Sequence, residues 1–77
     1  MNKARRKWLQ TVIDQLEAQK MEIDSIQEEE QEALDNLPDN LNCTDMAANM
    51  EENADGLGDA ASDLEDIISN LQEILER

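Results

Sequence analysis

Hydrophobic residues recur at alternating steps of three and four along the second half of the chain, from residue 43 to residue 75. This spacing returns side chains to one stripe of an α-helix, and over several heptads it is typical of the seam of a coiled coil or helix bundle. We therefore predict a helix over about 44–76. Its stripe comprises Cys43, Met46, Met50, Asn53, Leu57, Ala60, Leu64, Ile67, Leu71 and Ile74, and is widened by Ala47, Ala54, Ala61, Ile68 and Leu75.

The first half of the chain carries a similar stripe, which predicts a helix over about 2–36. Asn2 is placed to cap this helix, because its side chain can accept a hydrogen bond from an unpaired backbone amide. Gln19 and Glu30 interrupt the stripe and Lys20 lies beside it; such polar residues lower stability but fix register or oligomeric state. The stripe comprises Leu9, Val12, Leu16, Gln19, Ile23, Ile26, Glu30, Ala33 and Leu37, with Ile13 and Leu34 alongside.

The segment 37–43 breaks both patterns. Pro38 disfavours helix at the residue before it, and the Asp and Asn residues that follow favour turns. Thr44 or Asn42 can then cap the second helix. A break this short between two long helices folds the chain back into an antiparallel hairpin. Residues 1–77 are thus predicted to form one all-α, coiled-coil-like hairpin domain.

The two stripes are wider than one hairpin can cover, since each helix then has a single neighbour. Two hairpins that pair into a four-helix bundle would cover the rest, so we expect a homodimer. Trp8 is a candidate anchor of that interface, although it could equally pack within its own hairpin. The expected interface residues are Trp8, Leu9, Ile13, Leu64, Ile68, Leu71 and Leu75.

Twenty acidic residues against six basic ones give the chain a net charge of −14. The bases lie near the start, at Lys20 and at Arg77, and none occurs between Met21 and Glu76. Direct binding to nucleic acid is therefore not expected, because it needs Lys and Arg against phosphate. A protein with a basic surface is the expected partner. Within the hairpin, the bases from Lys3 to Lys7 are predicted to lie beside three acids of the second helix, Asp66, Glu73 and Glu76.

The composition offers little for catalysis or metal binding. There is no His, Tyr or Phe, and the single Cys43 is expected as a small buried hydrophobe on the seam. The stretch from Glu51 resembles half of a calcium-binding loop, but Ser62 stands where that loop needs a bidentate Glu. We expect no enzyme, no cofactor and no metal. No signal peptide or membrane span is visible, which favours a cytoplasmic protein.

Carboxylates step by three or four residues along the side of the second helix opposite its stripe. No Lys or Arg is interspersed, although a surface tuned for stability would use Glu–Lys pairs. With the acids of the first helix, doubled in a dimer, their density approaches that of a nucleic-acid backbone; an ordinary solvated face is the other interpretation. The expected partner-binding residues are Glu28, Glu29, Glu32, Asp35, Glu52, Asp55, Asp59, Asp63 and Asp66. Gly56 and Gly58 make the middle of this helix thin, which allows local bending or close approach of another chain, although both could equally be plain surface residues.

Two stretches, MNKARRK at 1–7 and QEEEQEALDNLPDNL at 27–41, resemble small acidic helical proteins of phages, prophages and mobile elements of Gram-positive bacteria. The resemblance implies a bacterial host cell, where such proteins often inhibit nucleic-acid-binding machinery. The first hypothesis is therefore an acidic, DNA-mimicking inhibitor that occupies a basic site on a host or defence protein. The alternative is a self-associating coiled-coil scaffold or accessory subunit whose charge serves only solubility.

Overall fold

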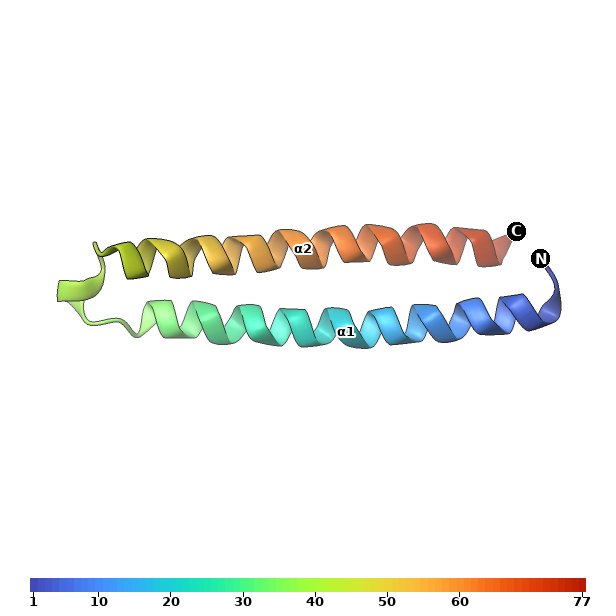
Figure 1. Ribbon diagram of the computed structural model, residues 1–77, viewed down its shortest axis with the longest axis horizontal. Coiled ribbons are helices and arrows are strands. Elements are labelled where there is room, and N and C mark those ends of the chain that lie inside the picture. The colour runs from blue at the N-terminus through green and yellow to red at the C-terminus, as the bar shows by residue number, and fades with distance from the viewer.

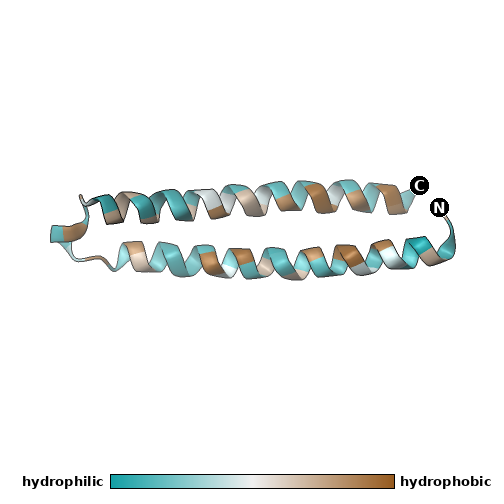
Figure 2. Cartoon of the chain, in the orientation of Figure 1, coloured by the Kyte–Doolittle hydropathy of each residue, from teal (hydrophilic) through white to brown (hydrophobic).

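The computed structural model describes residues 1–77 and confirms the antiparallel hairpin. Helix α1 (Lys3–Asp35) and helix α2 (Asp45–Glu76) pack side by side, joined by a single 3-10 turn, η1 (Asp39–Leu41). The hairpin is 60 Å long, and both termini lie at the end opposite the turn, which we call the open end (Figure 1). The more hydrophobic residues of both helices lie largely on their facing sides (Figure 2).

Side-chain caps set where each helix begins. The Asn2 side chain accepts a hydrogen bond from the Arg5 amide at 2.8 Å. Thr44 does the same for the Ala47 amide at 3.3 Å, and its hydroxyl donates to the Leu41 carbonyl at 2.7 Å. Thr44 therefore joins the start of α2 to the turn before it. The prediction of Asn2 as a cap is confirmed, and of the two candidates for α2 the structure uses Thr44.

Every second position of the predicted stripe is shifted by one residue in the observed seam, whereas the alternate positions, such as Leu57 and Leu64, are partly covered as predicted. In α2 the fully covered side chains recur every seven residues, at Ala47, Ala54, Ala61 and Ile68. The residues before them, predicted as seam, remain accessible: Met46 and Ile67 are each 49% exposed. A stripe of three apolar positions per heptad is too wide for one neighbour, and the small alanines let α1 approach closely. Those positions, predicted only to widen the stripe, are its centre.

The same shift holds in α1. Ile13 is fully buried, whereas Val12 is only partly covered and Ile26 is 51% exposed. Gln19, predicted to interrupt the seam, is exposed, and Lys20 is partly buried in its place. Cys43 was also placed on the seam, and this is wrong: it precedes the Thr44 cap and is exposed.

Packing against α1 explains why a residue without a Cβ stands at Gly58, whereas no such contact exists at Gly56. The Gln27 side chain lies over Gly58 and donates a hydrogen bond to the Ala54 carbonyl at 3.2 Å. A Cβ on Gly58 would stand 2.7 Å from the Gln27 amide nitrogen, whereas a Cβ on Gly56 would meet nothing. The Gln27 side chain therefore occupies the space that a Cβ on Gly58 would need, and Gly56 is plain surface.

The predicted ion pairs at the open end are not formed. Asp66 and Glu73 stand on the side of α2 opposite the seam, so they face away from α1. The Arg6 guanidinium instead donates to the Leu75 carbonyl at 2.6 Å, where it complements the negative end of the α2 dipole. The one basic side chain with carboxylate partners is Lys20.

Candidate functional site

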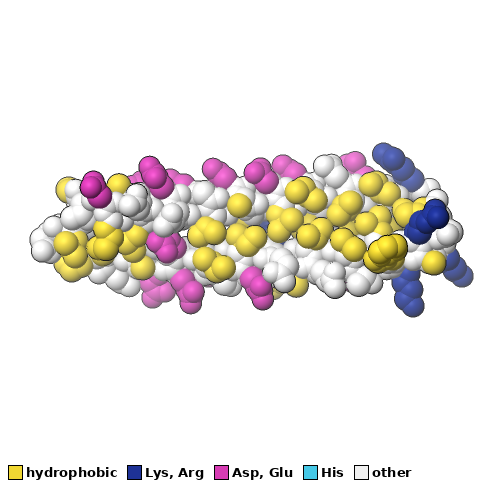
Figure 3. Space-filling view, in the orientation of Figure 1, with side chains coloured by type: hydrophobic (Ala, Val, Ile, Leu, Met, Phe, Trp, Pro, Cys, Tyr) yellow, Lys and Arg dark blue, Asp and Glu magenta, His cyan; other side chains and the backbone are white.

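The nine acids predicted to bind a partner are all exposed, but they form two ridges rather than one surface. Glu52, Asp59 and Asp66 are spaced by seven and lie opposite the α2 seam, with Asp55 and Asp63 beside them. The acids of α1, from Glu28 to Asp35, lie on the far side of the hairpin. Most of the acidic side chains visible in Figure 3 accordingly lie along the two long edges of the molecule, although acidic atoms also appear on the face toward the turn end. We call these two sets the acidic ridges.

Almost none of this charge is neutralised within the hairpin. Only Asp24 and Glu65 form ion pairs, both with the Lys20 ammonium, at 3.2 and 3.8 Å. The remaining contacts of carboxylates come from neutral side chains, such as Gln31 to Asp35 at 3.0 Å. The ridges therefore retain their charge for solvent or for a partner.

The charge divides sharply between the two halves of the hairpin. Residues 21–63, the turn half, carry fourteen carboxylates and no base. Residues 1–20 and 64–77, the open half, carry six carboxylates and six bases. The whole net charge of −14 thus belongs to the turn half, and both ridges have most of their length there.

The two flanks of the seam differ in chemistry as much as the two halves do. On one flank, polar residues join the helices: Gln72 donates to Glu17 at 3.2 Å, and Lys20 reaches Glu65. We call the other flank, which consists of the residues just before the seam positions, the apolar flank. Its hydrophobic members are Val12, Ile26, Ala33, Met46, Ala60, Ile67 and Ile74. A band of hydrophobic side chains runs along the face drawn in Figure 3.

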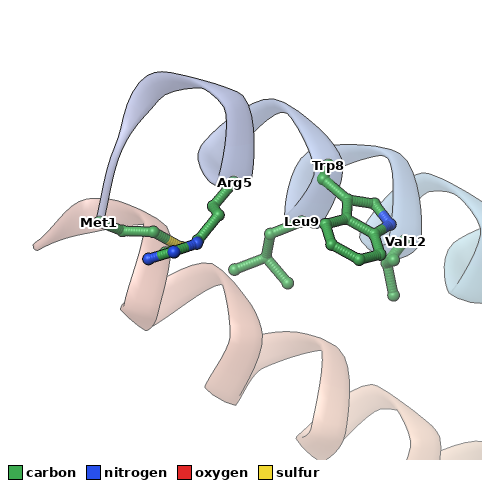
Figure 4. Close-up of a pocket in the computed structure, with 5 residues that line it drawn as sticks. All are labelled: Met1, Arg5, Trp8, Leu9 and Val12. Carbon is green, nitrogen blue, oxygen red and sulfur yellow. The ribbon is translucent and has the colours of Figure 1, made fainter.

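At the open end the apolar flank continues onto Trp8. An open depression of about 290 Å³ is lined by Met1, Arg5, Trp8, Leu9 and Val12 (Figure 4). Leu9 points toward α2, whereas the Trp8 indole lies beside Val12 on the surface of α1. Trp8 is 72% exposed, so it does not pack into its own hairpin core.

Two of the expected dimer contacts are occupied within the hairpin. Ile13 and Ile68 are 0% and 1% exposed and are the largest of the fully buried side chains, so they cannot also face a second copy. Leu9, Leu64, Leu71 and Leu75 are partly covered by the same packing, and Trp8 is free. The exposed apolar residues that the interface prediction missed are those of the apolar flank. The α2 positions of the apolar flank carry no charged residue, and this pattern in the sequence could have identified the flank.

No family model matches the chain, and no curated protein or solved structure matches it either. No group of three or more Cys, Asp or Glu side chains is arranged to hold a metal ion. Neither helix has an uncharged apolar stretch long enough to cross a membrane. The two surface features that stand out on the hairpin are the acidic ridges and the apolar flank.

Proposed function

We propose that this chain is a non-catalytic binding protein whose acidic ridges occupy the basic, nucleic-acid-binding surface of another protein. The observation that carries the proposal is the turn half, with fourteen carboxylates, no base and exposed ridges on both edges. A basic cleft built for phosphates attracts such a surface at long range and exchanges counterions with it, as it does with nucleic acid.

The ridges suit this role in spacing as well as in sign. Successive carboxylates of the α2 ridge are three or four residues apart, which is about 5 to 6 Å along the helix. Phosphates along one DNA strand follow one another at about 3.4 Å, so one ridge has the same sign of charge as a strand at a lower linear charge density. Two ridges on opposite edges of a rod supply two such lines, as a duplex does. The inhibitor is proposed to act in the cytoplasm of a bacterial host, in keeping with the phage-like resemblance of residues 1–7 and 27–41.

The proposed working form is a homodimer, in which two hairpins make a four-helix bundle. The uncovered apolar flank supports this part of the proposal. The same flank is also the observation that favours the competing function, a self-associating scaffold that needs no acidic partner site.

Capture from a bacterial lysate separates the two functions. Immobilised protein is expected to retain nucleic-acid-binding proteins at about 0.1 M salt and to release them at about 1 M, where the Debye length falls to about 3 Å. Retention that persists at high salt would contradict the acidic mechanism and would support the scaffold, because apolar contacts are not screened.

A further inference from the structure

The hairpin leaves more surface exposed than a compact protein of its size. Its accessible area is 5828 Å², whereas about 4,700 Å² is typical for a monomer of this mass. The excess, about 1,100 Å², exceeds the roughly 800 Å² that each partner contributes to a standard interface. Only five side chains are fully buried, too few for a core that is stable alone. The molecule therefore has both the area and the need for a partner on its apolar flank.

We propose that the apolar flank is covered by a second copy of the chain in antiparallel orientation, so that the open half of each hairpin lies against the turn half of the other. This arrangement rests on the homodimer included in the proposed function and adds its geometry. A symmetric pair brings one flank against the same flank of its partner, so a largely apolar strip, interrupted only by neutral polar residues such as Gln19 and Asn53, is complementary to itself.

Charge selects the orientation. A parallel pair would place one turn half, with fourteen carboxylates and no base, beside another. The antiparallel pair instead places Arg5, the base that lines the depression beside Trp8, near the turn end of the other copy, which carries Asp35, Asp39 and Asp45, when the hairpins overlap fully. Like charges side by side oppose association and opposite charges favour it, so the antiparallel pair is the more stable one.

Apolar side chains line both halves of the flank, so an overlap of full length can cover all of them. The open half carries Trp8, Ile67 and Ile74, and the turn half carries Ile26, Met46, Ala33 and Ala60. Charge, rather than side-chain size, therefore selects the antiparallel pair. Ridge acids that stand opposite the seam, such as Glu52 and Asp59, lie outside this contact, so the dimer presents an acidic turn half at each end.

The exposed Cys43, at the turn, reports the orientation directly. Nitroxide spin labels on Cys43 are expected to lie about 50 to 60 Å apart in the antiparallel dimer, close to the length of one hairpin. A parallel dimer would bring them within about 20 Å, two helix spacings. The double variant Ala4→Cys/Cys43→Ser, labelled at the open end, should also give a long distance. A mixture of the two labelled proteins should give a new short distance, from one turn to the partner's open end.

Matched variants test the surface itself by sedimentation equilibrium. Ile26→Gln, on the apolar flank, should weaken dimerisation about tenfold or more, since each dimer contains this residue twice. Met21→Gln removes a more exposed side chain, 70% against 51%, which borders the same open depression as Ile26 but follows a seam position instead of preceding one, so it should leave the dimer unchanged. A short Cys43 distance, a monomer at all concentrations, or equal effects of the two variants would overturn the proposal. A monomer that still captures its partner would overturn the dimer alone, and an antiparallel dimer without capture would overturn the binding function alone.

Discussion

The open half and the turn half of this hairpin have the same backbone geometry but opposite roles. The open half contains the two large buried side chains, Ile13 and Ile68, and its charges balance. The turn half is packed around Ala47, Ala54 and the Gln27–Gly58 contact, and it carries the whole net charge. The open half therefore contains the larger buried core. The turn half has smaller side chains in its core and carries most of the unpaired carboxylates on its surface.

Truncation of a seam residue in each half should test the comparison of the two halves most clearly. Ile68→Ala is expected to lower the free energy of unfolding by about 3 kcal/mol, because it removes a fully buried side chain and leaves a cavity. Met50→Ala, in the turn half, should cost about 1 kcal/mol, since Met50 is only partly covered. Urea denaturation measures both at one protein concentration; equal losses would show that stability is spread evenly.

Replacement of each glycine by alanine should show at which position the turn half can be made more stable. Gly56→Ala is expected to stabilise the protein by about 1 kcal/mol, because its Cβ meets nothing and alanine favours helix. Gly58→Ala gains the same propensity but displaces the Gln27 side chain and its bond to Ala54, worth about 1 kcal/mol, so the net change is near zero.

Removal of the Gln27 side chain provides the control. In a Gln27→Ala background the Gly58→Ala change should recover the full gain, as thermal denaturation would show. An equal gain in both backgrounds would mean that the Gln27 contact contributes nothing.

Salt should stabilise the turn half more than the open half, by a few tenths of a kcal/mol for each relieved repulsion. Between about 0.01 M and 0.15 M salt the Debye length falls from about 30 to about 8 Å, which screens the fourteen carboxylates from one another. Amide hydrogen exchange should therefore slow with salt over residues 47–57 and change little over residues 64–74. A uniform change along α2 would contradict the division into two halves.

The sequence predicted the hairpin and the Asn2 cap because these depend on local periodicity, Pro38 and side-chain reach. The shift of the seam was not predicted, since three adjacent positions per heptad were apolar and any two of them could form it. The alanines at 47, 54 and 61 and the packing of Gln27 over Gly58 determine which positions form the seam. Both features depend on contacts with the other helix, which the sequence of one helix does not reveal.

The acidic surface was likewise predicted in its residues but not in its arrangement. Each of the nine acids is exposed, as a site on the solvent side of a helix requires. The acids of the two helices were taken as one set, yet Glu32 and Asp59 cannot share a surface, because each stands opposite the seam on its own helix. An antiparallel hairpin turns such positions to opposite edges, which only the packing of α1 on α2 reveals.

The central claim, that the charge of the turn half binds the partner, is tested by removing equal charge from each half. One variant carries Glu52→Gln, Asp55→Asn, Asp59→Asn and Asp63→Asn; its control carries Asp14→Asn, Glu17→Gln, Glu73→Gln and Glu76→Gln. Each immobilised protein is exposed to bacterial lysate at about 0.1 M salt, where screening is moderate, and is then washed with duplex DNA as competitor. The control should retain the proteins that the unaltered chain captures and release them to DNA, while the turn-half variant, still helical by circular dichroism, should not capture them. Undiminished capture by the turn-half variant, or capture that DNA does not reverse, would contradict the account.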